Sequence, residues 1–363
     1  MSTQQGTTTE RNAVDQEKLN QFLGKFVGDL GAALHAPTVI VGEKLGLYKA
    51  LARSGHLTSK ELAGITNTKE RYVREWLAAQ AASGYVSYDH LTGKYWLSPE
   101  QAFTLADESS PAYLPGAFYI ASATFRDEPL IVQAFRSGSG VGWHEHSSDL
   151  FKGTEMFFRP GYAANLVSSW IPSLTGMVAR LEQGASVADV GCGHGASTII
   201  MAKAYPNSTF VGYDYHGPSI EAARTKAKEA GLGERVRFEV ASASSYPGKN
   251  FDLVAVFDAL HDMGDPAGVS GHVRQSLKPD GTWMIVEPFA NETVAENLNP
   301  VGRIFYCAST MLCTGASLDQ EVGLALGAQA SESSIREVVQ RGGFSKFRRA
   351  TQTPFNRVFE AKP

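Results

Sequence analysis

Residues 187–198 read VADVGCGHGAST, and this stretch decides the fold. An apolar strand runs into a turn that contains Gly191, Gly193 and Gly195. Glycine permits a tight turn and the close approach of a ligand, and the N–H groups of the helix that follows then face that ligand. The stretch therefore predicts a nucleotide-type pocket at the end of a strand.

Asp189, two positions before the first glycine, separates two kinds of nucleotide pocket. A dinucleotide site typically has Gly-x-Gly-x-x-Gly after an uncharged strand, whereas this chain has Gly-x-Gly-x-Gly with an acid inside the strand end. A carboxylate is poorly placed for a pyrophosphate and well placed for a cation. S-adenosylmethionine (SAM) carries an ammonium and a sulfonium where NAD carries phosphates, so the stretch indicates a SAM site.

The composition is that of a globular protein and limits the classes of partner. The chain has 363 residues, 43% of them hydrophobic and 19% charged, which is enough for two domains and a large core. A formal net charge of -4 gives no global field for nucleic acid or an anionic membrane. The three cysteines form no Cys-x-x-Cys pair, which fits a reducing compartment. We therefore expect a cytoplasmic protein whose partners include neither nucleic acid nor a membrane, with a disordered tail at residues 1–14.

Residues 15–105 are expected to form an N-terminal domain of helices that includes a winged helix. Apolar residues recur at helical spacing from Leu19 to Leu30 and give one apolar face, which needs a partner. A winged helix has the order helix, turn, helix and hairpin. The short helices and the two strands are expected at residues 57–66, 70–80, 84–88 and 94–98.

Two functions remain open for the winged helix, namely DNA binding and dimerisation. Its second helix carries a nearly balanced set of charges, Lys69, Glu70, Arg71, Arg74 and Glu75, and so offers few donors to phosphates. We therefore favour a scaffold that makes a homodimer together with the helix of residues 19–30. The alternative is a DNA-binding regulator that uses SAM as an effector, and salt-dependent DNA binding would support it.

Strands and helices alternate beyond Gln183, which is typical of a doubly wound parallel sheet. Two further apolar runs, 346–352 and 355–361, are separated by Thr353-Pro354 alone, too short for a parallel crossover. The last strand is therefore expected to be antiparallel. The fold class is α/β, with a mostly parallel, seven-stranded, Rossmann-like sheet in residues 184–363. The other strands are expected at residues 186–192, 209–215, 236–242, 251–259 and 282–287, and the helices near 197–203, 219–229 and 268–277.

Residues 106–183 are rich in aromatic side chains, and we expect this segment to cover the substrate. Most aromatic side chains belong to a core, so only some of these are expected to touch a ligand. His144-Glu145-His146 suggests a metal site, but two histidines at this spacing share a face only on a strand and no cysteine lies nearby, so we expect no metal. The substrate candidates are Trp143, His144, His146, Phe157, Arg159 and Tyr162, with Arg303 further along the chain.

Asp214 ends the second strand of the expected sheet and is followed by Tyr215. At the carboxyl edge of a parallel sheet, such an acid can accept hydrogen bonds from both ribose hydroxyls, and the tyrosine can stack on adenine. The alternative is that Asp214 is the N-cap of the following helix. We favour the ribose, because the acid occurs together with Asp189 and the glycine loop.

These motifs, together with the stretch from Phe251 to Asp258, resemble the successive motifs of class I SAM-dependent methyltransferases. The resemblance spans residue 183 to the end of the sequence, and it implies that the glycine loop cradles the methionine part of SAM, that Asp214 binds the ribose and that the loop after the third strand binds adenine. That loop reads Ala-Ser242-Ala243 where the family often has Gly-Asp-Ala. The cofactor-binding candidates are Asp189, Gly191, Cys192, Gly193, Gly195, Asp214, Tyr215, Ser242, Ala243 and Asp258.

The order of elements also resembles a narrower group, the small-molecule O-methyltransferases with an N-terminal winged-helix dimerisation domain, and actinobacterial-type relatives of unassigned acceptor. The group has a His-Asp pair and then an aromatic residue after the fourth strand, and this chain has Leu260-His261-Asp262-Met263, with methionine in place of the aromatic residue. The resemblance implies that His261 is the general base and that Glu287, at the end of the next strand, steers it.

The chemistry of methyl transfer supports His261 without the resemblance. Displacement at a sulfonium needs an aligned acceptor and, for a hydroxyl or thiol, removal of its proton near neutral pH. Histidine titrates in that range, and a carboxylate at Glu287 or Asp262 would orient its ring. The alternative is that His261 only packs at the strand end. We therefore expect a SAM-dependent methyltransferase that transfers a methyl group to an oxygen, nitrogen or sulfur of a small metabolite.

Overall fold

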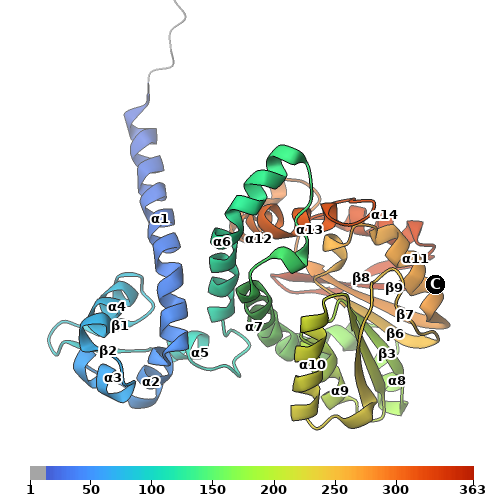
Figure 1. Cartoon of the computed structure of the whole chain (residues 1–363), viewed down its shortest axis with the longest axis horizontal. Helices are drawn as coiled ribbons and strands as arrows, with labels where there is room; N and C mark the ends of the chain where they lie inside the picture. The colour runs from blue at the N-terminus through green and yellow to red at the C-terminus, as the bar shows by residue number, and fades with distance from the viewer. Residues whose placement is uncertain (1–13) are drawn as a thin grey trace, which may run out of the picture. The chain divides into compact units, whose positions relative to one another are not determined.

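The computed structural model describes residues 14–363. The tail expected at residues 1–14 lies, apart from Val14, outside the described residues. Within residues 14–363, no helix combines the length and the apolar character needed to cross a membrane. The chain separates into two compact units at Ala102 and Phe103, inside helix α5 (Pro99–Leu105) (Figure 1).

In the described part of the first unit, residues 14–102, helices α1 to α4 are followed by a hairpin, the order expected for a winged helix. Thr58 and Glu61 form a capping box at the start of the third helix, which fixes where that helix begins. Leu57 pairs with Tyr95 and so ties the helices to the second strand of the hairpin. The elements are α1 (Gln16–Lys44), α2 (Leu47–Ser54), α3 (Ser59–Ile65), α4 (Glu70–Ala82), β1 (Ser87–Asp89) and β2 (Lys94–Trp96).

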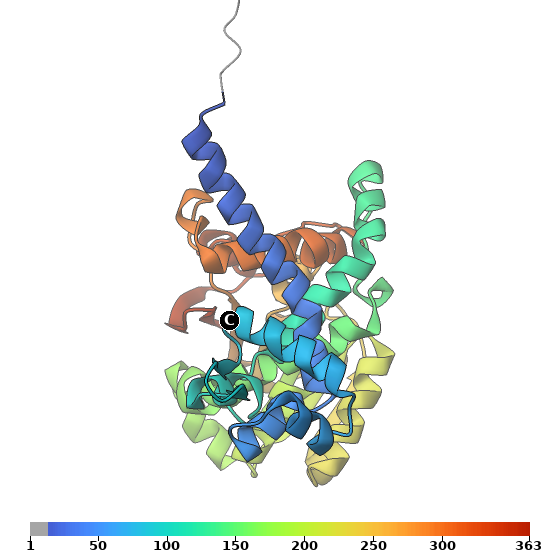
Figure 2. The same ribbon diagram turned by 90° about the vertical axis from the view of Figure 1, so that its left-hand side faces the viewer.

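Helix α1 is longer than the apolar pattern of residues 19–30 indicated, because it runs from Gln16 to Lys44. Asp15 caps its start by accepting hydrogen bonds from the backbone N–H groups of Glu17 and Lys18. The N-terminal part of α1 extends beyond the other elements of its unit (Figure 2). Its apolar face is exposed at Phe22, Leu23, Phe26, Val27, Leu30 and Leu34.

The second unit begins with the aromatic-rich segment, which is mostly helical. Gly153 of the second long helix packs against Tyr119 and the backbone of the first, where a Cβ atom would come within 2.8 Å of the Tyr119 side chain. The elements are α6 (Pro115–Ser137), η1 (Trp143–Glu145), α7 (Ser148–Asn165), the π-helical turn η2 (Leu166–Trp170), η3 (Ile171–Ser173) and α8 (Met177–Gln183).

A seven-stranded sheet forms the centre of the second unit, with the strand order β5-β4-β3-β6-β7-β9-β8. The first five strands of this order are parallel, and β9 is antiparallel to both of its neighbours. The mostly parallel sheet and the antiparallel last strand are therefore confirmed. The strands are β3 (Ser186–Val190), β4 (Thr209–Asp214), β5 (Val236–Val240), β6 (Phe251–Phe257), β7 (Leu277–Pro288), β8 (Lys346–Gln352) and β9 (Asn356–Lys362).

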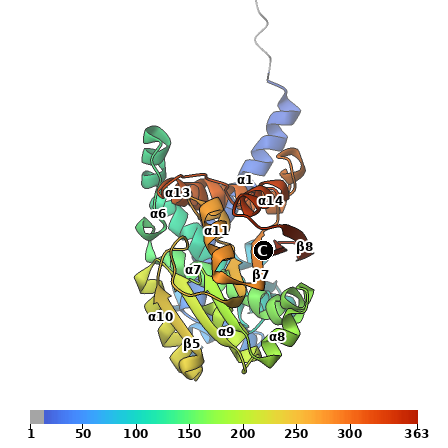
Figure 3. The same ribbon diagram turned by 90° about the vertical axis from the view of Figure 1, so that its right-hand side faces the viewer.

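Helices cover both faces of this sheet, because its strands alternate two sets of buried apolar side chains. One set, which includes Val187 and Leu253, packs against α8, α9 (Ala196–Ala204) and α10 (Gly217–Glu229). The other set packs against α11 (Pro266–Ser276) and α14 (Glu332–Arg341) (Figure 3). The remaining elements are η4 (Gly233–Arg235), η5 (Leu260–Asp262), η6 (Ala295–Asn297), α12 (Pro300–Ala308), the π-helical turn η7 (Ser309–Cys313) and α13 (Thr314–Leu318).

The strand order places the candidate residues at one edge of the sheet. From β3 the chain proceeds to β4 on one side, whereas β6 lies on its other side, so the order reverses at β3. Ligands of doubly wound sheets bind outside the carboxyl ends of the strands at such a reversal. The glycine loop, Asp214 and Asp258 follow the carboxyl ends of β3, β4 and β6 there.

Candidate active site

The glycine loop joins β3 to α9 and uses a backbone conformation that favours glycine. Gly191, Gly193 and Gly195 have φ angles of 76°, 51° and 76°. A Cβ atom on Gly195 would lie 2.6 Å from Phe238, so this position also lacks space. At Gly193 nothing lies within 4 Å of the Cβ position, so that side of the loop is open.

Gly195→Ala is expected to lower the free energy of unfolding by about 2–4 kcal/mol, because positive φ and overpacking against Phe238 both add cost. Urea denaturation followed by circular dichroism measures this loss. Gly217→Ala is the matched control, since nothing lies within 4 Å of its Cβ position and its φ is not positive. Equal losses in the two variants would contradict the argument.

Asp189 lies at the end of β3 and is 1% exposed. Its Oδ2 accepts hydrogen bonds from the hydroxyls of Ser197 and Thr198, both at 2.6 Å. Its Oδ1 is buried and has no hydrogen-bond partner among residues 14–363. Burial raises the pKa of Asp189 to about 6. One oxygen therefore links the end of β3 to the start of α9, and the other is a buried acceptor that no described residue pairs.

Asp214, the last residue of β4, stabilises the glycine loop by hydrogen bonding. Its Oδ2 accepts a hydrogen bond from the N–H of Gly193 at 2.9 Å, and its Oδ1 accepts one from the N–H of His216 at 2.9 Å. The N-cap of α10 is His216, so the alternative assignment of Asp214 as that cap is wrong. Burial raises the pKa of Asp214. A carboxylate has about four acceptor positions, so both oxygens keep capacity for further donors.

The other cofactor candidates differ in their environments. Tyr215 is 49% exposed, with its ring 6.2 Å from that of His144. Ser242 is exposed and its hydroxyl lies 3.0 Å from that of Ser244, while Ala243 packs against the core. Cys192 is buried in the core, where burial raises the pKa of its thiol well above the ordinary value. The thiol therefore has the surroundings of a packing residue.

His261 and Glu287 form a buried pair at the ends of β6 and β7. The ring Nδ1 of His261 lies 2.5 Å from Glu287 Oε2, and Glu287 Oε1 accepts a hydrogen bond from the N–H of Leu260 at 3.0 Å. The two side chains are 4% and 1% exposed. Glu287 therefore fixes both the turn that carries His261 and the orientation of its ring.

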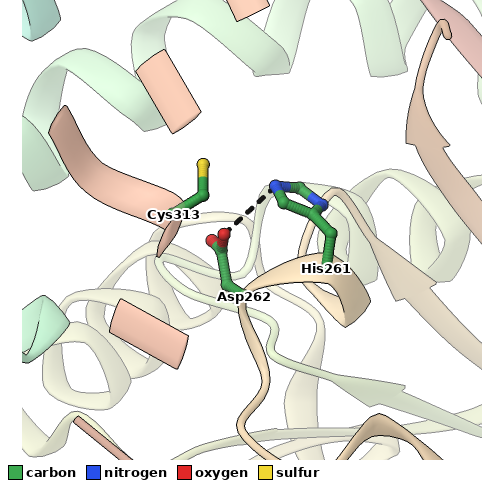
Figure 4. A group of neighbouring side chains, drawn as sticks. All are labelled: His261, Asp262 and Cys313. Atoms are coloured by element: carbon green, nitrogen blue, oxygen red, sulfur yellow. Dashed lines mark ion pairs between the residues drawn. The ribbon is translucent and has the colours of Figure 1, made fainter. Parts of the chain in front are cut away.

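Asp262 faces the other nitrogen of the same ring. Its Oδ1 lies 3.1 Å from His261 Nε2. Figure 4 shows the Asp262 carboxylate directed at the ring. Burial alone lowers the pKa of His261, but the negative charges of Asp262 and Glu287 outweigh it and raise that pKa well above the ordinary value. Burial raises the pKa of Asp262. The two carboxylates thus favour the protonated form of the ring over the neutral one.

Cys313, at the end of the π-helical turn η7, completes this cluster. The ligand atoms of His261, Asp262 and Cys313 lie within 4.8 Å of one another (Figure 4). Burial raises the pKa of the Cys313 thiol to about 12, so it is protonated at neutral pH. A metal ion would have to displace the thiol proton and the pairing of His261 with Asp262, so we interpret the cluster as a proton-transfer site. The absence of a metal remains a prediction.

Asp258 occupies the turn after β6 in a strained backbone conformation, with a φ of 50°. The hydroxyl of Tyr162 donates to its Oδ2 at 2.9 Å, and Asn356 Nδ2 donates to its Oδ1 at 2.8 Å. Burial raises the pKa of Asp258 to about 8, with the charge of Glu287 as the next cause. Tyr162, expected at the substrate, therefore anchors α7 to the sheet edge.

The remaining substrate candidates are not brought together as one group. His146 is buried against Asp127, and Trp143 lies at its side, with ring centroids 6.2 Å apart. Arg159 pairs with Glu155 on its own helix at 3.2 Å. His144 and Arg303 are exposed, and Phe157 is half-buried.

The structure adds residues that the sequence did not single out. Each of them contacts a candidate residue from a different element, and no motif points to it. The thiol of Cys313 is the clearest case, since only the packing of η7 brings it to His261. The added residues are Asp127, Ser197, Thr198, Cys313 and Asn356.

Family models match two parts of the chain. Residues 181–330 match a model described as a methyltransferase domain. Residues 33–107 match a model described as an Rv2258c-like winged HTH domain. The protein therefore has the class I methyltransferase fold. More particularly, it combines a methyltransferase domain with an N-terminal winged helix-turn-helix domain.

Individual relatives agree with these domains. The 27-O-demethylrifamycin SV methyltransferase of Amycolatopsis mediterranei is 33% identical over 139 residues, which are 36% of this chain and 50% of that protein. The chain thus spans about half the length of this curated relative.

Two solved structures resemble nearly the whole chain. The human N-acetylserotonin methyltransferase in complex with SAM has a TM-score of 0.67 at 15% identity, covering 97% of this chain and 99% of that one. An O-methyltransferase family protein from Burkholderia thailandensis has a TM-score of 0.67 at 17% identity, covering 96% and 98%. At these identities the likeness concerns the fold.

Proposed function

We propose that the protein is a SAM-dependent methyltransferase that transfers a methyl group to an oxygen of a small, partly apolar metabolite, with His261 as the general base. The main support for a general base is the contact between His261 and Glu287. The distance between Nδ1 of His261 and Oε2 of Glu287 is 2.5 Å. Similar proteins are named O-methyltransferases, and these names support oxygen as the acceptor atom.

The glycine loop fits SAM better than a phosphate-bearing cofactor. Among residues 14–363, Asp189 Oδ1 has no hydrogen-bond partner although it is buried, which is costly unless a donor or a cation reaches it. The open side of Gly193 leaves room for a ligand against the backbone. Asp214 keeps acceptor capacity for ribose hydroxyls at the end of β4. When bound, SAM supplies an electrophilic methyl group on a positively charged sulfur.

The chain's own residues prepare the acceptor for attack. Glu287 accepts a hydrogen bond from Nδ1–H of His261, so in the neutral ring the lone pair lies on Nε2. Nε2 faces Asp262, and an acceptor hydroxyl that reached Nε2 would give up its proton there, which would leave its oxygen as the nucleophile. Asp262 and Glu287 then stabilise the imidazolium that forms. An apolar cluster with Trp143, Leu312 and Cys313 lies on this side and excludes water.

Calorimetry and a transfer assay test the proposal. SAM titrated into the full chain is expected to bind with one site per subunit, and tritium from methyl-labelled SAM is expected to appear in members of a panel of phenols and hydroxylated polycycles. Failure of SAM to bind would overturn the cofactor assignment. Binding without transfer to any hydroxyl, but with transfer to amines or thiols, would overturn the assignment of oxygen.

We further propose a homodimer in which the exposed apolar face of α1 packs against a second copy. Phe26→Glu with Leu30→Glu is expected to weaken the dimer at least about a hundredfold, because two charges would be buried in an apolar contact. Light scattering after size exclusion measures the mass. Gln21→Glu, on the opposite side of α1, is the control and is expected to remain dimeric. A monomeric wild type would contradict the proposal.

The geometry of α4 supports a scaffold over a DNA-binding role. Arg71 pairs with Glu75 and Arg74 with Glu70, each at 2.6 Å. Both arginines are thus engaged on their own helix, and phosphates would have to compete with carboxylates for them.

A further inference from the structure

A second histidine–carboxylate pair lies in the helical segment over the sheet edge. His146 Nδ1 lies 2.9 Å from Asp127 Oδ2, and the two side chains are 0% and 7% exposed. The backbone N–H of Ser147 also donates to Asp127, at 3.3 Å. Asp127 belongs to α6 and His146 follows η1, so the pair fixes the connection between α6 and α7.

The other nitrogen of His146 is buried and has no hydrogen-bond partner among residues 14–363. Leaving a buried polar atom unpaired costs about 1–3 kcal/mol. With Nδ1–H donated to Asp127, the neutral ring presents a lone pair on Nε2. That nitrogen therefore requires a donor, either a hydroxyl or an N–H group.

The loop that carries His146 is hydrogen-bonded to the segment that follows Cys313. The N–H of Val141 donates to the carbonyl of Gly315 at 3.0 Å. A Cβ atom on Gly140 would clash with the backbone nitrogen of Asp319, so the backbones of the two segments pack directly against each other here. The ring centroid of Trp143 lies 6.2 Å from that of His146, and Trp143 packs against the apolar cluster that contains Cys313, so His146 lies on the same side as the base.

We infer that His146, oriented by Asp127, binds the methyl acceptor through Nε2, and that the acceptor therefore carries a second donor group besides the one that is methylated. This inference rests on the proposed function. His261 takes the proton of the group that reacts, and His146 accepts a hydrogen bond from a hydroxyl or N–H that is retained. Asp127 is the positioning residue, because it selects the ring tautomer with a free Nε2.

Naphthol probes test the second donor directly. The dihydroxynaphthalene isomers and the two simple naphthols are titrated by calorimetry into the protein saturated with S-adenosylhomocysteine. At least one dihydroxy isomer is expected to bind ten times more tightly than either naphthol. His146→Gln and, as a second variant, Asp127→Asn are expected to reduce this gain below threefold, with the affinity for S-adenosylhomocysteine unchanged. His90→Gln, in the exposed turn of the hairpin, is the control and is expected to retain the full gain.

Each outcome decides the inference. Equal binding of mono- and dihydroxy probes, no binding of any probe, or a gain that survives both variants overturns it. Loss of affinity for all probes alike would show that His146 and Asp127 serve packing only, which also overturns it. Failure of S-adenosylhomocysteine to bind the wild type is a separate result, since it contradicts the proposed function.

Discussion

His261→Gln is expected to lower kcat by about 10²- to 10⁴-fold, because the variant loses the group that removes the acceptor proton. SAM affinity is expected to stay within twofold, since His261 binds the acceptor side. The assay is transfer of labelled methyl to a hydroxyl acceptor found in the panel above. Wild-type turnover in this variant would show that alignment alone drives the reaction, as it can for an acceptor with an available lone pair.

The pH dependence of the same reaction separates a base from a packing residue. Because Asp262 and Glu287 raise the pKa of His261, the neutral ring forms only at a pH above the ordinary histidine range, and kcat/KM is expected to rise with pH through that pKa. Glu287→Gln removes one of the negative charges, so it is expected to lower the midpoint of the rise as well as kcat.

Glu229→Gln, an exposed glutamate on α10, is the control for charge and is expected to leave the midpoint in place. A midpoint that stays unchanged in Glu287→Gln would show that His261 is not the group that titrates.

Asp214→Ala is expected to weaken SAM binding by about a hundredfold or more, which corresponds to about 2.7 kcal/mol. Two effects combine in this variant. The ribose hydroxyls would lose a charged acceptor, and the N–H of Gly193 would lose the carboxylate that holds the glycine loop. Calorimetric titration of SAM measures the change.

Asp107→Ala, at an exposed carboxylate away from the sheet edge, is the control and is expected to bind SAM as the wild type does. Asp214→Asn keeps an acceptor oxygen without the charge and is expected to lie between the two. An Asp214→Ala variant with wild-type affinity would contradict both the ribose assignment and the bracing role.

The fold was predictable from the sequence because its signals are local. The alternation of apolar strands and helices, and the short Thr353-Pro354 link, specify the parallel sheet and the antiparallel last strand. The ends of elements were less predictable. Helix α1 continues to Lys44 although its apolar face was recognised only to Leu30, because packing of its later residues, such as Val39 and Ile40, sustains it.

The candidate site residues that could be predicted from the sequence are those at the carboxyl ends of the strands. Asp189 and Asp214 lie at the carboxyl ends of β3 and β4, and His261 lies in the turn after β6; parallel strands bring such residues to one edge. Their partners were not predictable. Ser197 and Thr198 look like ordinary first-turn residues of α9, and Cys313 reaches the cluster only because the π-helical turn η7 packs there. Such contacts depend on the tertiary arrangement of segments that carry no motif.

Gly140 has a consequence for comparing this protein with its relatives. Its position leaves no room for a methyl group against the backbone of Asp319, so the loop of His146 and the segment beyond Cys313 approach as closely as two chains can. A relative with any side chain at this position must hold the two segments further apart. A different residue at this one position would therefore change how the loop of His146 packs against the segment beyond Cys313.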